Sequence, residues 1–306
     1  ETLKEALQNR LAKEQSLLFA EGFADPCGTA FKDKAGAVAA ARAADLVVLV
    51  LSEDCAISGE GASRADLGLS GVHREMLDAL TEAGKPIALV VETGRPLALT
   101  AAHEKVAALL VAWHPGTEGR AALAEILTGE FAPSGKLPMT FPRSVGQVPI
   151  SYSDLPTSRP STGDRYTTGY LDEKPTPLYA FGHGLSYTTF AYSGLKVSAP
   201  GMARRGSIEI RFDIQNTGTR SGQEVAQLYT RQLVAARSRP MRELKGFQKV
   251  TLQPGQRKTV RFTLKASDLA YHDDEGNAVI EPGKFAVFVG GSSAADLEGG
   301  FTLAAD

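Results

Sequence analysis

Cysteine and tryptophan are the scarcest residues of this 306-residue chain, which has two cysteines and one tryptophan. Two cysteines cannot build a disulfide scaffold, so the fold must be stabilised mainly by a hydrophobic core. Cys27 and Cys55 each follow an expected strand. The sequence leaves open whether they form one bridge in an oxidising compartment or stay as two buried free thiols.

A charge excess of either sign is also missing, because 33 basic and 35 acidic residues leave a net charge of −2. Nucleic acid is not an expected partner, since phosphate binding requires clustered Lys and Arg. No apolar run reaches about 18 residues, so no transmembrane helix and no membrane partner are expected. The first residues, ETLKEAL, predict an amphipathic helix and not a signal peptide.

Buried strands and helices alternate in the first half of the chain. Continuous runs rich in Val and Leu are typical of strands covered on both faces, and helical segments separate them. The expected strands are residues 45–52, 86–92 and 106–113, and the expected helices are residues 37–44, 71–83 and 117–127. This alternation predicts an α/β domain with a mainly parallel sheet.

The second half follows a different pattern. Residues 138–186 are rich in Pro, Ser, Thr, Gly and Tyr with little periodicity, which indicates an ordered wrap or linker. From Phe190 onward apolar residues alternate with polar ones, most clearly over residues 207–215, and turn signals separate the runs. About seven such strands predict a β-sandwich. The expected division is an α/β domain over 1–143, a wrap over 144–185 and the β-sandwich over 186–306.

A glycine-rich loop follows the first buried strand. Glu60 lies between Gly59 and Gly61, where the backbone can bend freely and aim a carboxyl group into a cleft. In open α/β sheets, ligand sites gather at the carboxyl ends of strands. Arg64 could pair with Glu60 or with Asp66. From residue types alone, a solvated acidic loop is the more common arrangement.

The segment around Glu60 resembles the acid/base loop of glycoside hydrolase family 3, and further segments are similar to that family in chain order. They are SGEGASRADLGL (58–69), TGRPL (93–97), AWHPGTEG (112–119), PSGKLPMTFP (133–142), YAFGHGLSYTTF (179–190), ELKGF (243–247) and EPG (281–283). The resemblance covers nearly all of the chain and is strongest to bacterial periplasmic β-glucosidases of the family. It implies an α/β three-layer sandwich followed by an all-β fibronectin type III-like sandwich.

The resemblance also implies a chemistry. Retaining glycosidases use two carboxyl groups, one as nucleophile and one as general acid/base. Glu60 falls on the position of the family's catalytic acid/base, and Ser58, Arg64 and Trp113 are the expected substrate-binding residues. The family's nucleophile is an Asp on an N-terminal barrel, which needs about 250 residues and does not fit in this chain. No cofactor and no metal are expected.

Other motif residues have structural interpretations. Arg95 is expected to anchor a carboxylate at a strand-to-helix turn, and Glu118 to cap the following helix. PSGKLP is expected to pin the wrap, and His183 to be a hydrogen-bonded hinge. Asp273 and Asp274 are expected in a solvated turn and not in a metal site. Whether Trp113 lies on a sugar-binding rim or packs under the wrap is open.

The function predicted in this way is the C-terminal part of a retaining β-glucosidase, with a β-glucoside or oligosaccharide as substrate and the barrel as its partner domain. By itself the chain is expected to have little or no activity. The alternatives are a β-xylosidase or arabinosidase of the same family, or a non-catalytic carbohydrate-binding or assembly module. A flavodoxin-like nucleotide-binding domain is disfavoured, because no glycine-rich phosphate loop follows the first strand. A periplasmic or secreted location follows from the resemblance, and a homodimer is left open.

Overall fold

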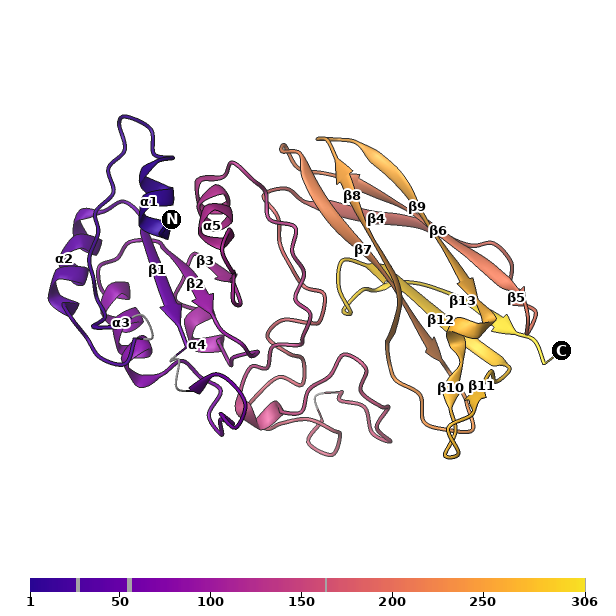
Figure 1. The fold of residues 1–306 in the computed structure, drawn as a ribbon. Helices are drawn as coiled ribbons and strands as arrows, with labels where there is room; N and C mark the ends of the chain where they lie inside the picture. Colours follow the sequence, from indigo (N-terminus) through magenta and orange to yellow (C-terminus); the bar gives the residue numbers. More distant parts are fainter. Residues whose placement is uncertain (26–27, 54–56, 163, 306) are drawn as a thin grey trace. The chain divides into compact units, whose positions relative to one another are not determined.

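The computed structural model describes residues 1–25, 28–53, 57–162 and 164–305 (Figure 1). Cys27 and Cys55 lie outside the described residues. The chain divides into two compact units, the first made of Glu1–Phe131 and Phe141–Val148 and the second of Ala132–Thr140 and Pro149–Asp306. The wrap expected over residues 144–185 falls mostly in the second unit, and its bounds stay a prediction.

The first unit is an α/β sandwich. Its elements are α1 (Leu3–Gln8), α2 (Lys34–Ala43), β1 (Val47–Ser52), α3 (Gly71–Thr81), β2 (Ile87–Glu92), α4 (Thr100–His103), β3 (Ala108–Val111) and α5 (Gly119–Thr128). The strands pair in parallel in the order β1-β2-β3. Helices α2 and α3 lie on one side of this sheet, and α1 and α5 lie on the other (Figure 1). The α/β domain with a parallel sheet is therefore confirmed.

Local sequence explains where these elements lie. The first five residues of β2 are buried, as its run of Ile, Ala, Leu and Val predicts. Helix α3 begins where the Ser70 side chain accepts a hydrogen bond from the His73 amide. Helix α5 ends at Gly129, which has a φ of 80° in the left-handed region. Glu118 occupies the N-cap position of α5 as expected, but its side chain makes no capping hydrogen bond.

The second unit is a β-sandwich. Its strands are β4 (Phe190–Val197), β5 (Gly201–Met202), β6 (Ser207–Asn216), β7 (Gly222–Gln232), β8 (Glu243–Leu252), β9 (Arg257–Lys265), β10 (Tyr271–His272), β11 (Ala278–Val279), β12 (Gly283–Gly290) and β13 (Leu297–Leu303). A five-stranded sheet has the order β5-β13-β12-β7-β8, and a three-stranded sheet has the order β4-β6-β9. Neighbouring strands are antiparallel except β13 and β5, and β10 pairs with β11 as a separate hairpin.

The core of the sandwich confirms the alternation expected for residues 207–215. Ile208, Ile210, Phe212 and Ile214 of β6 are all at most 2% exposed, and the residues between them are less buried. These four side chains belong to one core cluster with residues of the five-stranded sheet, including Val287 of β12. A period of two places every second side chain on one face, which is why this strand can line a core.

The described residues of the wrap between 148 and 189 form no helix or strand. Aromatic side chains hold this segment instead. Tyr152 stacks on Phe181 with ring centroids 4.2 Å apart, and Tyr152 also meets the buried ring of Tyr229 on β7 edge-on. These side chains pack against the outer face of the five-stranded sheet. A long segment without regular hydrogen bonding is thus held by buried ring surface.

The PSGKLP segment, residues 133–138, is hydrogen-bonded to the end of the wrap, as expected. The Lys136 ammonium donates hydrogen bonds to both carboxylate oxygens of Glu224 and to the Gly184 carbonyl. The Leu137 amide donates to the His183 carbonyl at 2.8 Å, and the His183 amide donates to the Ala180 carbonyl. The backbone of His183 is therefore hydrogen-bonded through both its amide and its carbonyl, and its role as a hinge stays a prediction.

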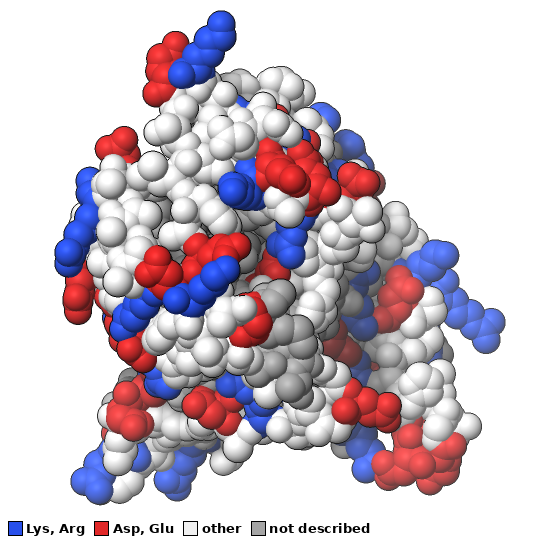
Figure 2. All heavy atoms as spheres, turned by 60° about the vertical axis from the view of Figure 1, so that its left-hand side comes forward, with Lys and Arg blue, Asp and Glu red and all other residues white. Residues whose placement is uncertain are grey.

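The surface carries charges of both signs. On the face that Figure 2 shows, basic and acidic side chains are interspersed. Asp273 lies in the solvated turn expected for it, where hydrogen bonds from the Asn277 backbone and other turn groups lower the pKa of its carboxyl. Among the described residues, no group of three or more His, Cys, Asp or Glu could hold a metal ion. No helix in the same ranges combines the length and hydrophobicity needed to cross a bilayer.

Candidate active site

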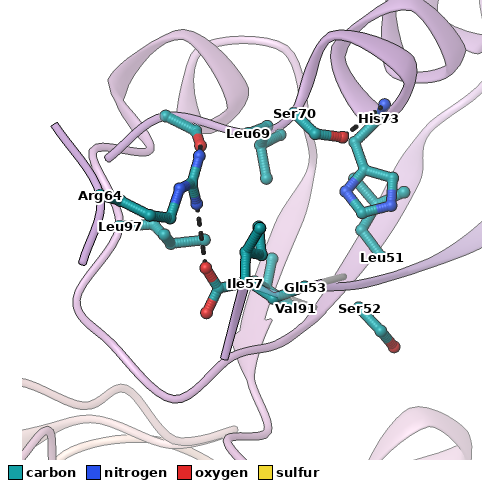
Figure 3. Close-up of a pocket in the computed structure, with 11 residues that line it drawn as sticks. Leu51, Ser52, Glu53, Ile57, Arg64, Leu69, Ser70, His73, Val91 and Leu97 are labelled. Carbon is teal, nitrogen blue, oxygen red and sulfur yellow. Dashed lines mark hydrogen bonds and ion pairs between the residues drawn. The ribbon is translucent and has the colours of Figure 1, made fainter. Parts of the chain in front are cut away.

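The carboxyl ends of the three parallel strands meet at one edge of the first unit's sheet, where α/β folds place their ligand sites. Glu53 follows β1, Thr93 and Arg95 follow β2, and Trp113 follows β3. Figure 3 shows the part of this edge around Glu53 and Arg64, whose side chains point toward each other. Polar groups from segments far apart in sequence are thus brought together.

Glu60 stands on a tight turn over residues 59–62, here called the Glu60 turn. The Ala62 amide donates to the Gly59 carbonyl at 3.2 Å, which places Glu60 and Gly61 at its two corners. Gly61 has a φ of 75°, and a turn of this kind favours glycine at its second corner. A Cβ built on Gly59 or Gly61 would meet nothing within 4 Å, so the space beside both glycines is open.

The Glu60 side chain is exposed, and among the described residues it makes no hydrogen bond or ion pair. A carboxyl group presented in this way can reach a molecule that approaches the turn. The backbone of the turn is held by hydrogen bonds that depend on a buried carboxylate, Glu53.

Glu53 is the centre of that anchor, and its side chain is only 5% exposed. One carboxylate oxygen accepts from Arg64 Nη1 at 2.9 Å and faces Arg95 Nε at 3.3 Å. The other oxygen accepts from the Thr93 hydroxyl and from the Gly94 amide. Because a buried carboxylate is tolerated only when it is paired and hydrogen-bonded, this arrangement is a satisfied one. These five residues are called the Glu53 cluster.

Arg95 connects the Glu53 cluster to the Glu60 turn. Its Nη1 donates to the Ala62 carbonyl at 3.1 Å, and its Nη2 donates to the Ile57 carbonyl. One planar guanidinium therefore holds the backbone on both sides of Glu60 while its Nε faces Glu53. Arg64 also donates to the Gly68 carbonyl at 2.9 Å, which fixes the chain beyond the turn.

Ser58 lies close to the segment after β2. A Cβ built on Gly94 would stand 3.0 Å from His114 Nε2 and 3.3 Å from Ser58 Oγ, so both side chains crowd the space over this glycine. Trp113 is the one non-glycine residue with positive φ in the described ranges, at 53°. Its ring meets Phe141 edge-on with centroids 5.8 Å apart, and the side chain is partly buried. Trp113 thus packs on an aromatic neighbour and keeps some exposed surface.

A second carboxylate at this edge belongs to a separate ion pair. Glu92, the last residue of β2, binds Arg120 of α5 through both oxygens and accepts from the Ser52 hydroxyl at 2.7 Å. Its side chain is 11% exposed. The Glu92 carboxylate is thus nearly as buried as that of Glu53, and no contact joins this pair to the Glu60 turn among the described residues.

The structure confirms part of the site that the sequence predicts. Arg95 anchors a carboxylate, as expected. Arg64 was expected to pair with Glu60 or Asp66, and the structure pairs it with Glu53 instead, because the turn directs Glu60 outward. Glu53 was missed altogether. A signal was present, since an acidic residue directly after a buried strand must find a cation if it is to be buried.

Family models match both halves of the chain. A model described as the glycosyl hydrolase family 3 C-terminal domain matches residues 1–187, and one described as a fibronectin type III-like domain matches residues 224–293. The chain is 45% identical over 270 residues to a periplasmic β-glucosidase of Salmonella typhimurium, covering 87% of this chain and 35% of that protein. It is 39% identical over 260 residues to a β-xylosidase of Formosa agariphila, covering 85% of this chain and 35% of that protein.

Solved structures of β-glucosidases also superimpose on this chain. A β-glucosidase from Listeria innocua in complex with glucose superimposes with a TM-score of 0.83 at 37% identity, over 89% of this chain and 38% of that one. A β-glucosidase of intestinal bacteria involved in saponin metabolism superimposes with a TM-score of 0.86 at 32% identity, over 99% of this chain and 45% of that one. The chain therefore spans about a third of the length of the curated relatives named above, 35% in each case.

Proposed function

This chain belongs to glycoside hydrolase family 3, and from that premise we propose that it supplies the general acid/base carboxyl group, Glu60, of a retaining β-glucosidase. The substrate would be a terminal, non-reducing β-D-glucosyl residue. The single observation that carries the proposal is the Glu60 turn, which presents an exposed carboxyl at the carboxyl edge of the sheet while Arg95 holds both sides of the turn.

The partner carboxylate is proposed to lie on a barrel domain outside this sequence. A retaining mechanism needs two carboxyl groups about 5–5.5 Å apart. A general acid must also stay protonated near neutral pH, which requires burial or a neighbouring negative charge. Glu60 is exposed and unpaired in the described part of the chain, so a second surface would have to close over the turn. The barrel that accompanies this domain in the resembled family would supply that surface.

The proposed reaction has two steps. The Asp nucleophile of the barrel attacks the anomeric carbon, and the Glu60 carboxyl protonates the departing glycosidic oxygen, which leaves a glycosyl-enzyme and a Glu60 carboxylate. That carboxylate then removes a proton from water, whose oxygen attacks the anomeric carbon and releases the sugar with retained configuration. Ser58, Arg64 and Trp113 are proposed to line the substrate site. For Arg64 this role is indirect at most in the present arrangement, because Glu53 and Gly68 occupy its guanidinium.

Glu60→Gln in an enzyme that carries this chain together with its barrel tests the proposal. Hydrolysis of cellobiose should fall by about 10²–10⁴-fold, because the sugar leaving group needs the proton. A dinitrophenyl β-glucoside should still release its phenol in a fast burst, since that leaving group needs no acid. Added azide should then speed turnover and yield the β-glucosyl azide, because an anionic nucleophile needs no general base.

Glu82→Gln is the matched control, since Glu82 is an exposed carboxylate at the C-cap of α3 with no part in the Glu60 turn. It should change neither substrate's kinetics. Equal kinetics of Glu60→Gln and the parent enzyme on both substrates would contradict the proposal. The chain alone should bind glucose or cellobiose weakly at most and should not hydrolyse cellobiose. Rapid hydrolysis by the chain alone would remove the need for a barrel nucleophile.

A β-xylosidase is the second candidate, favoured by the Formosa agariphila relative of that name. The ratio of kcat/KM for nitrophenyl β-glucoside and β-xyloside decides between the two sugars. We also propose a periplasmic or secreted location, which the Salmonella typhimurium relative supports by its printed name. Fractionation of cells that express the full protein tests this.

A further inference from the structure

The Glu53 cluster is built so that one buried carboxylate controls the backbone around Glu60. Glu53 is itself held by the sheet, because its amide donates to the Glu92 carbonyl at 2.9 Å and continues the pairing of β1 with β2. The two strands are well buried at this end, because Leu51 of β1 and Leu89, Val90 and Val91 of β2 are all at most 1% exposed. Glu53 therefore starts from a rigid position.

Two of the four partners of Glu53, Arg95 and Arg64, connect it to the segment that carries Glu60. Arg95 reaches the carbonyls of Ile57 and Ala62, and Arg64 lies directly after the turn. The side chains of both arginines are largely buried, at 19% and 15% exposed. Two guanidinium groups facing the same oxygen would repel each other if the negative charge of Glu53 were removed. The carboxylate is thus what allows both arginines to stay in place.

Apart from Arg95 and its own backbone hydrogen bond, the Glu60 turn has open space around its two glycines in the described part of the chain. Gly59 and Gly61 both have positive φ, and nothing among the described residues lies within 4 Å of the Cβ position of either. Glycine loses the most conformational entropy on ordering, so the turn depends on its anchors in addition to its one internal hydrogen bond, from the Ala62 amide to the Gly59 carbonyl. A catalytic group displaced by about 1 Å can lose 10²-fold in rate.

We propose that Glu53 is a positioning residue that sets the location of Glu60 through Arg95 and Arg64. This inference rests on the proposed function of Glu60. In the proposed reaction, Glu53 touches neither the substrate nor the reacting atoms. Its carboxylate keeps the two guanidinium groups in the geometry that holds the turn.

The test is a double-mutant cycle in the enzyme that carries this chain with its barrel. Glu53→Gln keeps the size of the side chain and removes its charge. It should lower kcat for cellobiose by about 10–100-fold with little change in KM, because the proton donor is misplaced and not the sugar. The burst of phenol from a dinitrophenyl β-glucoside should stay within about threefold of the parent.

The cycle separates positioning from a general structural effect. In a Glu60→Gln background, adding Glu53→Gln should change the cellobiose rate by less than about twofold, because the group that Glu53 positions is already gone. Glu92→Gln is the matched control, since it removes a buried carboxylate one strand away that touches no part of the Glu60 turn. It should leave the preference between the two substrates unchanged.

Each outcome has one meaning. If Glu53→Gln slows both substrates equally, or slows the Glu60→Gln enzyme as much as the parent, the positioning role is wrong while Glu60 can still be the acid/base. If Glu60→Gln itself shows no selective loss on cellobiose, the proposed function has failed first. Should Glu53→Gln not fold by circular dichroism, Arg95→Lys replaces it, because lysine keeps the charge but cannot hold both carbonyls and Glu53 at once. The same selective loss is expected of Arg95→Lys, and its absence overturns the proposal.

Discussion

Lys136→Ala is expected to destabilise the second unit strongly. Lys136 Nζ lies 3.1 Å from each carboxylate oxygen of Glu224 and 2.9 Å from the Gly184 carbonyl. The two charged side chains are only 13% and 7% exposed. Tyr192 donates a further hydrogen bond to Glu224 at 2.8 Å. Removing the lysine leaves a buried carboxylate with one hydroxyl partner and no positive charge.

The magnitude follows from that burial. Breaking a buried ion pair by removing one partner costs about 3–5 kcal/mol in the free energy of unfolding, whereas an exposed pair contributes about 0–1 kcal/mol. For a unit of this size each kcal/mol lowers Tm by roughly 2–4 °C, so the shift should be of the order of 6–20 °C. The double variant Lys136→Met with Glu224→Gln should recover most of the loss, because neither residue is then a buried unpaired charge.

Urea denaturation with two spectroscopic probes can measure this in the whole chain. All eight tyrosines lie between Tyr152 and Tyr271 in the second unit, and the sole tryptophan, Trp113, lies in the first. Tyrosine absorbance therefore reports the unfolding of the second unit, and tryptophan fluorescence reports the first. Arg237→Ala is the matched control, because it breaks the ion pair with Asp274 whose side chains are 54% and 70% exposed.

A Lys136→Ala variant that loses less than about 1 kcal/mol in the tyrosine-monitored transition would show that the Lys136–Glu224 pair contributes no more than an exposed ion pair. A double variant as unstable as the single one would contradict the expected recovery. In that case the loss would come from the missing hydrogen bonds of Lys136 and not from the stranded charge of Glu224.

Two further predictions concern the second unit. Burial, with the nearby Glu224 charge for Tyr192, raises the pKa of Tyr192 and Tyr229 above the ordinary value of 10.0. The unfolded chain therefore releases these protons first, so the stability they contribute is fully present below about pH 10 and is lost as pH rises above it. Tyrosinate absorbance should show these two groups ionising only together with unfolding, and ionisation in the folded state would contradict this. Gly182→Ala should lower the free energy of unfolding by at least about 1–2 kcal/mol, because Gly182 has a φ of 78° and a Cβ there would stand 2.1 Å from Gln227 Oε1. Denaturation by urea checks this, and an unchanged midpoint would show that the loop adapts.

Local patterns account for what could be predicted of the fold. Continuous Val and Leu runs predicted β1 and β2 within two residues of their bounds, and the alternation over residues 207–215 predicted β6. These patterns work because the periods of 2 and 3.6 follow from backbone geometry. The wrap was recognised by composition, but its anchoring by Tyr152 and Phe181 could not be, because ring stacking depends on where distant segments meet.

The candidate site divides in the same way. The glycines around residue 60 and the family-like motifs indicated the Glu60 turn and the carboxylate-anchoring role of Arg95. The predicted partners of Arg64, Glu60 and Asp66, are wrong, because its actual partner, Glu53, lies eleven residues away in sequence on the other side of the turn. Thr93 and Gly94, which complete the hydrogen bonds of Glu53, come from the next strand.

The two kinds of domain, their order, and the place of a carboxyl group on a glycine turn can all be predicted from the residues alone. Those features depend on local periodicity and backbone freedom, which neighbouring residues encode. The packing of distant segments is what makes Glu53 the buried residue on which two arginines and the Glu60 turn converge. A charge can be buried only where partners from several segments meet, and the parallel pairing of β1 with β2 creates that meeting point.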